Sequence, residues 1–159
     1  MDVVIGSTDV TKEGRRSDPG LITMLTQLSK ALHRRTSEEL LGMRLKQFLA
    51  LSYVRDHPGM SQQELEGAMM MDANSVVLLL NELETAHLVL RRRAPTDRRR
   101  HTVELTEAGA LAYERAEKAR ESLEDEMLAD LTPADRATLY KLVRRVLDGL
   151  LQPVPEARS

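Results

Sequence analysis

Two closely spaced helix start signals constrain the fold of this chain more than any other feature. Residues 61–64 have the sequence Ser-Gln-Gln-Glu, the spacing of a capping box, in which the serine hydroxyl accepts a backbone N–H and the glutamate reaches back. This predicts a short helix over 61–68. The methionines at 69–71 form a turn, and Asp72 is a good N-cap for a second helix over 73–86. Two short helices joined by a tight turn are typical of a helix-turn-helix unit.

Two β-prone runs flank a basic turn directly after these helices. Residues 88–90 have the sequence Leu-Val-Leu, and residues 101–105 alternate polar and apolar side chains at the period of a strand. The sequence of 91–100 is RRRAPTDRRR, with six arginines unpaired by nearby acids and one aspartate. The pattern predicts a β-hairpin with arginines around its tip, which is a wing.

Helices with apolar faces are predicted before this module. Leucines and methionines recur at helical spacing and indicate one long amphipathic helix over about 20–41. A second helix is expected over 44–56, and the His-Pro-Gly at 57–59 ends it, because proline disfavours helix in the residue before it. Residues 1–18 are polar and aperiodic and are expected to form a flexible arm.

Two further helices are predicted after the hairpin. Thr106 is a suitable N-cap for a helix over 107–129, which has apolar residues on one side. Thr132 followed by a proline is a strong start signal for a last helix over 133–151.

The composition supports helices packed on helices and excludes several kinds of functional site. Hydrophobic residues make up 42% of the 159, but aromatic residues only 3%, so the core must be aliphatic. The absence of cysteine excludes a disulfide scaffold, a cysteine-ligated zinc and a thiol nucleophile. No cofactor or metal site is predicted. No apolar run approaches the roughly 18 residues of a membrane span, and no secretory signal is evident, so a soluble cytoplasmic protein is expected.

The predicted fold class is mainly α with a small β-wing: a winged helix-turn-helix plus a helical dimerisation region. Residues 57–106 would form the winged helix-turn-helix, and the helices over 20–56 and 107–151 would form the helical region on either side of it. Two copies packed about a two-fold axis would bury the apolar faces of that region, and most small oligomers are dimers of this kind. The alternative is a monomer in which these helices cover their own core.

The distribution of charge is more informative than the net value of −2. The basic residues concentrate in 91–100, whereas an acidic excess lies between Glu114 and Asp130. A concentrated basic patch on an acidic remainder can be presented to an anion while the protein stays soluble.

Residues 83–109 resemble the MarR family of bacterial transcription regulators, and the helix order extends the resemblance over roughly 20–150. The carrying residues are Leu83-Glu84, Leu88-Val89, Arg91-Arg92, Asp97-Arg98-Arg99 and Leu105-Thr106-Glu107-Ala108-Gly109. The Asp-x-Arg wing followed at fixed distance by Leu-Thr-x-x-Gly is more specific than a generic helix-turn-helix signal.

The resemblance implies a division of roles, in which residues 57–106 would be the DNA-binding domain and residues 20–56 with 107–151 the dimerisation region. The helix over 73–86 would enter the major groove as the recognition helix, and the wing would reach the adjacent minor groove. Asp97 would brace the wing through a salt bridge, and Arg98 or Arg99 would enter the groove.

The chain departs from the family in two places. The family often has a glycine at the position of His87, and it commonly has an arginine within the recognition helix, where residues 75–82 contain no cation. Base contacts would then come from Asn74, Ser75 and Asn81, since asparagine pairs bidentately with adenine and serine serves several bases.

The candidate sites follow from these assignments. The residues expected to contact DNA are Ser61, Gln62, Asn74, Ser75, Asn81, Arg91, Arg92, Arg93, Asp97, Arg98, Arg99, Arg100 and His101. MarR-like proteins often bind small, frequently aromatic anions between the dimer helices and the winged module. Here the resemblance places His33, Arg44, Tyr53 and His57 at that junction, with ordinary surface or packing roles as the alternative.

The sequence therefore predicts a homodimeric regulator that binds a pseudo-palindromic operator in double-stranded DNA and acts as a repressor released by a small aromatic anion. The alternative is a winged-helix module whose basic hairpin binds an acidic protein. An enzyme is not expected, because no nucleophile or cofactor loop can be nominated.

Overall fold

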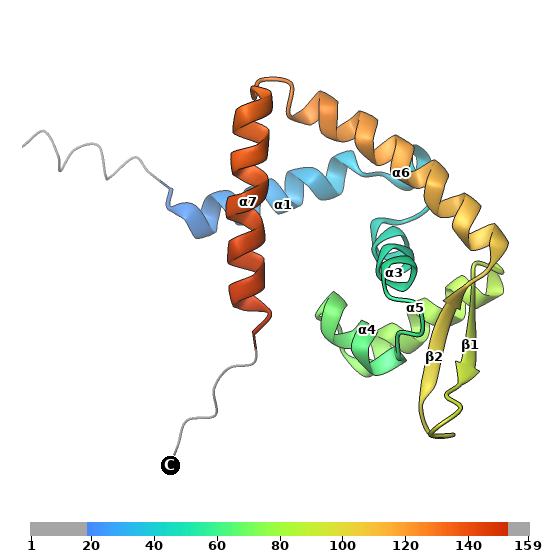
Figure 1. Ribbon diagram of the computed structural model, residues 1–159. Helices are drawn as coiled ribbons and strands as arrows, with labels where there is room; N and C mark the ends of the chain where they lie inside the picture. The colour runs from blue at the N-terminus through green and yellow to red at the C-terminus, as the bar shows by residue number, and fades with distance from the viewer. Residues whose placement is uncertain (1–18, 153–159) are drawn as a thin grey trace, which may run out of the picture. The chain divides into compact units, whose positions relative to one another are not determined.

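The computed structural model describes residues 19–152 and divides the chain into two compact units, with the boundary after Arg35 (Figure 1). The expected flexible arm at 1–18 lies outside the described residues. The first unit contributes one described helix, α1 (Leu21–Arg35). None of its residues is buried, and its apolar side chains, such as Leu21 and Ile22, are exposed.

The prediction of one continuous helix over 20–41 was wrong. The chain leaves the helix after Arg35, and a short helix α2 (Glu38–Leu41) begins beyond the break. The backbone N–H groups of Leu40 and Leu41 both donate to the carbonyl of Ser37, at 3.1 and 3.2 Å. Thr36 and Ser37 account for the break, because their side chains favour helix ends over helix interiors.

The second unit contains the winged module and the C-terminal helices. Its elements after α2 are α3 (Leu45–Asp56), α4 (Gln62–Met69), α5 (Ala73–Thr85), β1 (Val89–Arg93), β2 (His101–Leu105), α6 (Glu107–Met127) and α7 (Pro133–Leu150). This order and the two-stranded antiparallel sheet confirm the predicted fold class. No helix among residues 19–152 is long and apolar enough to cross a bilayer.

Capping side chains fix where these helices begin, as the sequence predicted. Glu64 N donates to Ser61 Oγ at 3.0 Å, and Ser61 N donates to the Glu64 carboxylate at 2.8 Å, which completes the capping box. Ser75 N donates to the Asp72 carboxylate at 2.8 Å. The hydroxyl of Thr132 accepts from the backbone at the start of α7 in the same way. Each cap satisfies a backbone donor that has no partner inside its helix.

Helix α3 packs against α4, α5, α6 and β2, and so lies at the centre of this unit (Figure 1). The core is aliphatic, as the composition required. Its fully buried side chains are Leu51, Leu65, Leu80, Leu83, Val76, Val89 and Val103. Phe48 stacks on Tyr113 of α6 with ring centroids 5.3 Å apart, and the Arg55 guanidinium lies 4.7 Å from the Tyr113 ring centre.

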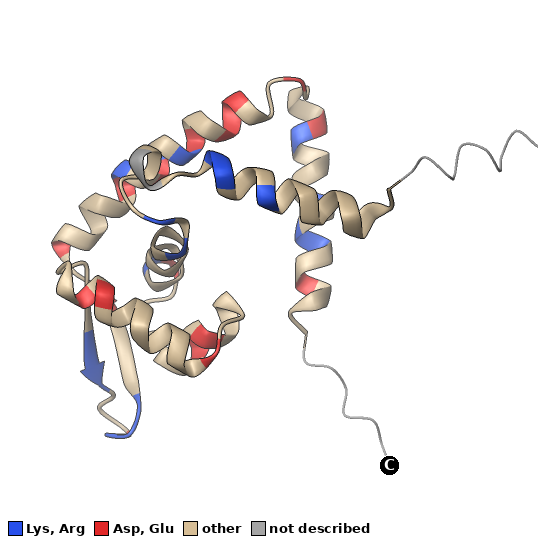
Figure 2. Ribbon diagram, turned by 180° about the vertical axis from the view of Figure 1, so that it is seen from behind, with Lys and Arg blue, Asp and Glu red and all other residues tan. Residues whose placement is uncertain are grey.

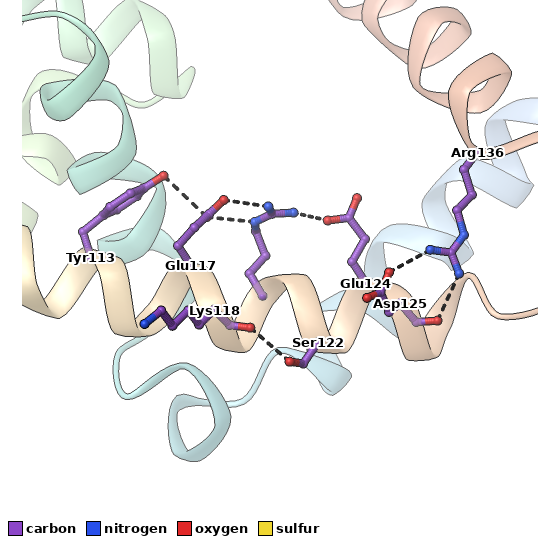
Figure 3. Close-up of polar contacts among 8 residues, drawn as sticks. Tyr113, Glu117, Lys118, Ser122, Glu124, Asp125 and Arg136 are labelled. Atoms are coloured by element: carbon purple, nitrogen blue, oxygen red, sulfur yellow. Dashed lines mark hydrogen bonds and ion pairs between the residues drawn. The ribbon is translucent and has the colours of Figure 1, made fainter. Parts of the chain in front are cut away.

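Helix α6 carries a row of polar contacts on one side (Figure 3). Arg120 pairs with Glu117 at 2.6 Å and also with Glu124, and this pairing is the main reason that the pKa of Glu117 lies below its usual range. At the end of the helix, Arg136 of α7 donates to the Asp125 carboxylate at 2.8 Å and to the Leu128 carbonyl at 3.2 Å. These bonds fix the corner between α6 and α7.

The turn from α5 into β1 brings the chain close to the start of α6. His87 has φ +60°, the left-handed region that explains why the family often has glycine there. Its carbonyl accepts from the Thr106 hydroxyl at 2.6 Å, and the Leu88 carbonyl accepts from Thr106 N at 3.1 Å. Gly109, one turn further on, lies directly against the Leu88 backbone: a Cβ at this position would lie 2.9 Å from the Leu88 carbonyl carbon and nearer still to its oxygen.

Gly109→Ala is therefore expected to lower the free energy of unfolding by about 3 kcal/mol, because neither backbone can move away without breaking the bonds of Thr106. Gly67→Ala is the matched control, since a Cβ there meets nothing within 4 Å. The control should gain roughly 0.5 kcal/mol from helix propensity. Urea denaturation of both variants measures the difference, and equal stabilities would contradict the steric account.

Candidate DNA interface

The exposed side of α5 has no unpaired charge, because each of its two acids forms an ion pair with an arginine. Asn74 and Leu78 are exposed, and Leu78 is 58% accessible, as expected from the excess of apolar residues in this helix. Of the two acids, Glu82 pairs with Arg44 and Glu84 pairs with Arg91. Both acids are therefore neutralised from neighbouring elements.

Two of the three predicted base-contacting residues are engaged within the protein. The Ser75 hydroxyl donates to the Asp72 carboxylate at 2.9 Å, and the two Ser75 hydrogen bonds lower the pKa of Asp72. The Asn81 side-chain oxygen accepts from the Arg91 guanidinium. Asn74 is the predicted base-contacting residue whose side chain stays open.

The basic residues of the wing lie on β1 and at the tip of the hairpin (Figure 2), and by their contacts the arginines fall into two groups. Arg91 and Arg92 are paired, with Glu84 at 2.6 Å and Glu104 at 2.9 Å. The expectation that all six arginines lack acidic partners was therefore wrong, because the strand register and the packing of β1 on α5 supply acids from outside the basic run. The other four, Arg93, Arg98, Arg99 and Arg100, are exposed and form no ion pair within the part of the chain that the structure describes.

Asp97 braces the wing tip, but through the backbone. Its carboxylate accepts from Arg99 N at 3.0 Å, and its carbonyl accepts from Arg100 N at 3.0 Å. No salt bridge of Asp97 occurs within residues 19–152, so that part of the expectation was wrong. An aspartate two residues before the donor forms a local turn with the backbone more readily than it reaches a flexible guanidinium.

The root of the wing is joined to the start of α4. Val103 N donates to the Met60 carbonyl at 2.9 Å, and Ser61 forms a β-bridge with Thr102. A cleft of about 160 Å³ lies beside this junction, lined by Ser61, Gln62, Gln63, Glu66, Arg99, Arg100 and His101. The start of α4 and two arginines here meet on one surface with a single acid, Glu66, and this excess of positive charge suits an anion such as phosphate.

Ser61 itself has a structural role at this cleft. It is only 8% exposed, and both its hydroxyl oxygen and its backbone N–H are engaged with Glu64. These two bonds from Ser61 lower the pKa of Glu64. Gln62, Arg99, Arg100 and His101 are thus the predicted residues that the structure places at the cleft with accessible side chains.

Glu84 is a positioning residue that the sequence reasoning missed. One carboxylate oxygen accepts from Arg91 N at 2.9 Å and the other from the Arg91 guanidinium at 2.6 Å, which ties β1 to α5. The guanidinium is the main reason that the pKa of Glu84 lies below its usual range. Glu84 is one of the residues that carry the family resemblance, but it is seven residues from Arg91 in another element, so the sequence did not indicate that the two pair.

Three of the four predicted ligand-binding residues, Arg44, Tyr53 and His57, lie on or at the ends of α3. Arg44 is the N-cap of α3 and its guanidinium pairs with Glu82. His57 Nδ1 lies 3.0 Å from the Tyr53 carbonyl one helical turn away. His33 belongs to the other compact unit. Their role in binding a ligand stays a prediction.

Glu84→Gln is expected to lower the free energy of unfolding by about 1–2 kcal/mol at neutral pH, because it weakens two charge-assisted bonds of a half-buried pair. The folded pKa of Glu84 is depressed, so this stabilisation exists above the pKa of an unfolded glutamate and is lost as the pH falls through the folded value. The gap between the wild type and the variant should therefore shrink in acid.

Urea denaturation at several values between about pH 7 and pH 3.5 measures this gap. Glu104→Gln is the control, since its pair with Arg92 is exposed and should contribute under about 1 kcal/mol. A gap for Glu84→Gln that does not change with pH would contradict the ionic role.

Comparison with known proteins places this module in a family. Residues 43–101 match the model of the MarR family. The putative transcriptional regulatory protein for the hcr operon of Thauera aromatica is 38% identical over 96 residues, which are 60% of this chain and 58% of that protein. The HTH-type transcriptional repressor NicR of Pseudomonas putida is 30% identical over 65% of each chain. The chain thus spans about three fifths of the length of these relatives.

Solved structures extend the similarity beyond the winged module. The crystal structure of a mutant MarR from E. coli in complex with operator DNA matches with a TM-score of 0.71 and 27% identity, over 80% of this chain and 93% of that one. The match covers the order of helices as well as the wing. Residues 43–101 therefore match the MarR family, and the chain has the winged helix-turn-helix fold of the solved MarR structures.

Proposed function

We propose that this protein is a sequence-specific regulator of transcription that binds double-stranded DNA as a homodimer. The observation that carries the proposal is the surface formed by Arg99, Arg100, His101 and the start of α4, next to the uncharged face of α5. Cations and helix N–H groups suit phosphates, whereas short polar and apolar groups suit base edges. The names of the relatives and the operator complex of MarR support the same role.

The wing supplies most of the affinity in this proposal. Arg93, Arg98, Arg99 and Arg100 contact phosphates or enter the minor groove, whose negative potential attracts arginine. Arg91, Arg92 and Asp97 hold the wing in shape through their contacts with Glu84, Glu104 and the backbone. Helix α5 lies in the major groove and selects the sequence.

Dimerisation would involve the helices on either side of the module, residues 20–56 and 107–151. No residue of α7 is buried, although one side of it is apolar. The exposed apolar residues of that side are Leu139, Leu142, Val143, Val146, Leu147 and Leu150. A second copy would cover them, and two winged modules would then meet half-sites about one helical turn apart.

Repression released by a small aromatic anion completes the proposal. NicR is named as a repressor, which supports this sign of regulation. His33, Arg44, Tyr53 and His57 are the candidates to bind the anion, with Arg44 as the cation among them.

The decisive test is fluorescence anisotropy of the full-length protein on labelled DNA from upstream of its own gene, together with duplexes selected from a random library. An excess of unrelated DNA is present throughout. Binding that resists this competitor and weakens as salt rises is the expected result. Failure of both DNA probes under these conditions would overturn the proposal and favour an acidic protein as partner of the wing.

Arg99→Ala is expected to weaken binding to specific and unrelated DNA alike, because a phosphate contact carries no sequence information. The slope of log affinity against log salt should fall by about 2 per dimer, roughly one for each arginine removed. Arg115→Ala, which removes an exposed arginine of α6, is the control and should leave the slope unchanged. An unchanged slope for Arg99→Ala would exclude it from the interface.

Val146→Asp is expected to convert the dimer into a monomer, because it places a charge in the centre of the apolar side of α7. Lys141→Asp is the control, since residue 141 lies on the opposite side of the helix at about 100° per residue. Sedimentation equilibrium measures the mass of both variants. A dimeric Val146→Asp protein would place the dimer contact elsewhere.

A further inference from the structure

On the exposed face of helix α5, the polar side chains other than Asn74 are engaged in contacts within the protein. Its buried side is formed by Val76, Leu79, Leu80 and Leu83. On the opposite side, Asn74 and Leu78 are four residues apart and both exposed, so they lie one above the other on the helix surface. The neighbouring polar residues Asn81 and Glu82 are held by Arg91 and Arg44.

This face limits which base pairs it can recognise. The commonest specific contact in the major groove is an arginine or lysine with the O6 and N7 atoms of guanine, and α5 contains neither residue. A leucine side chain has one favourable partner among the base edges of the groove, the C5-methyl group of thymine. Asparagine has its best partner in adenine.

We infer that Leu78 determines sequence specificity by packing against thymine C5-methyl groups, and that with Asn74 it selects a half-site with A·T pairs at neighbouring positions. Residues four apart are separated by about 6 Å along a helix, and base pairs by about 3.4 Å along DNA. The two side chains therefore reach base pairs within about two steps of each other. The inference rests on the proposed function, because it requires α5 to lie in the major groove.

The charge of the surrounding surface favours DNA as the occupant of this face over an apolar protein partner. The face is a single leucine beside an amide, and it lies on the helix that Glu84 joins to the strand leading into the arginines of the wing. A lone exposed leucine has no need of an explanation by itself. Leu78 lies in the helix between Asn74, whose amide can pair with adenine, and the strand that leads into the arginines of the wing. This position favours a base of DNA as its partner.

The test removes the methyl group and nothing else. A duplex selected by the full-length protein from a random library is remade with deoxyuridine at each thymine in turn, and anisotropy compares each duplex with its parent. For the wild type, at least one thymine in each half-site should lose about fourfold in affinity when its methyl group is removed, the value of one buried methyl group. For Leu78→Ala, the same replacement should have no effect.

Leu90→Ala is the matched control. Leu90 is also an exposed leucine of the winged module, 46% accessible against 58% for Leu78, but it lies on β1. The control should keep the full sensitivity to deoxyuridine whatever its overall affinity. Because Leu78 is exposed and alanine favours a helix, Leu78→Ala is expected to fold.

The outcomes separate this inference from the function on which it rests. Specific binding with no deoxyuridine effect at any thymine, or with an equal effect in the wild type and Leu78→Ala, would overturn the role of Leu78 and leave the DNA-binding function intact. A library that gives no common sequence would overturn both. A loss confined to the wild type and Leu90→Ala would establish the contact.

Discussion

The position of the wing depends on the close approach of two backbones, at Leu88 and at the first turn of α6. The Leu88 carbonyl accepts from Thr106 N, the His87 carbonyl accepts from the Thr106 hydroxyl, and Gly109 leaves the space for both. This junction closes the hairpin at its base, where one strand leaves α5 and the other enters α6. β1 and β2 have only five residues each, so the arginine-bearing tip is close to this junction. The junction therefore sets the direction of the tip.

A second constraint holds the wing against α5. Glu84 uses both carboxylate oxygens on Arg91, one for the backbone and one for the side chain. The same ion pair removes one acid from the surface of α5, and Arg44 neutralises a second, Glu82. The bonds that fix the geometry of the module therefore also pair both acids of α5 with arginines.

The features that depend on residues close together in the sequence were predicted, whereas those that depend on contacts between separate elements were missed. The caps at Ser61, Asp72 and Thr106 were predicted because donor and acceptor are three residues apart. The ion pairs Arg91–Glu84 and Arg92–Glu104 were missed, since their partners meet only through helix packing and strand register. The break before α2 was missed because Leu40 was assigned to the helix of Leu32 although residues 33–39 contain no apolar side chain, and the preference of Thr36 and Ser37 for helix ends was given too little weight.

The separation of charge in this module has a consequence for how affinity and specificity respond to conditions. Four of the six wing arginines form no ion pair within residues 19–152, so in the proposed complex much of the binding free energy that depends on counterion release would arise there. The face of α5 offers an amide and a leucine, whose contacts with bases involve no net charge and change little with salt. In the proposed complex, raising the salt concentration would therefore weaken binding to all DNA more strongly than it would reduce the sequence preference that comes from α5.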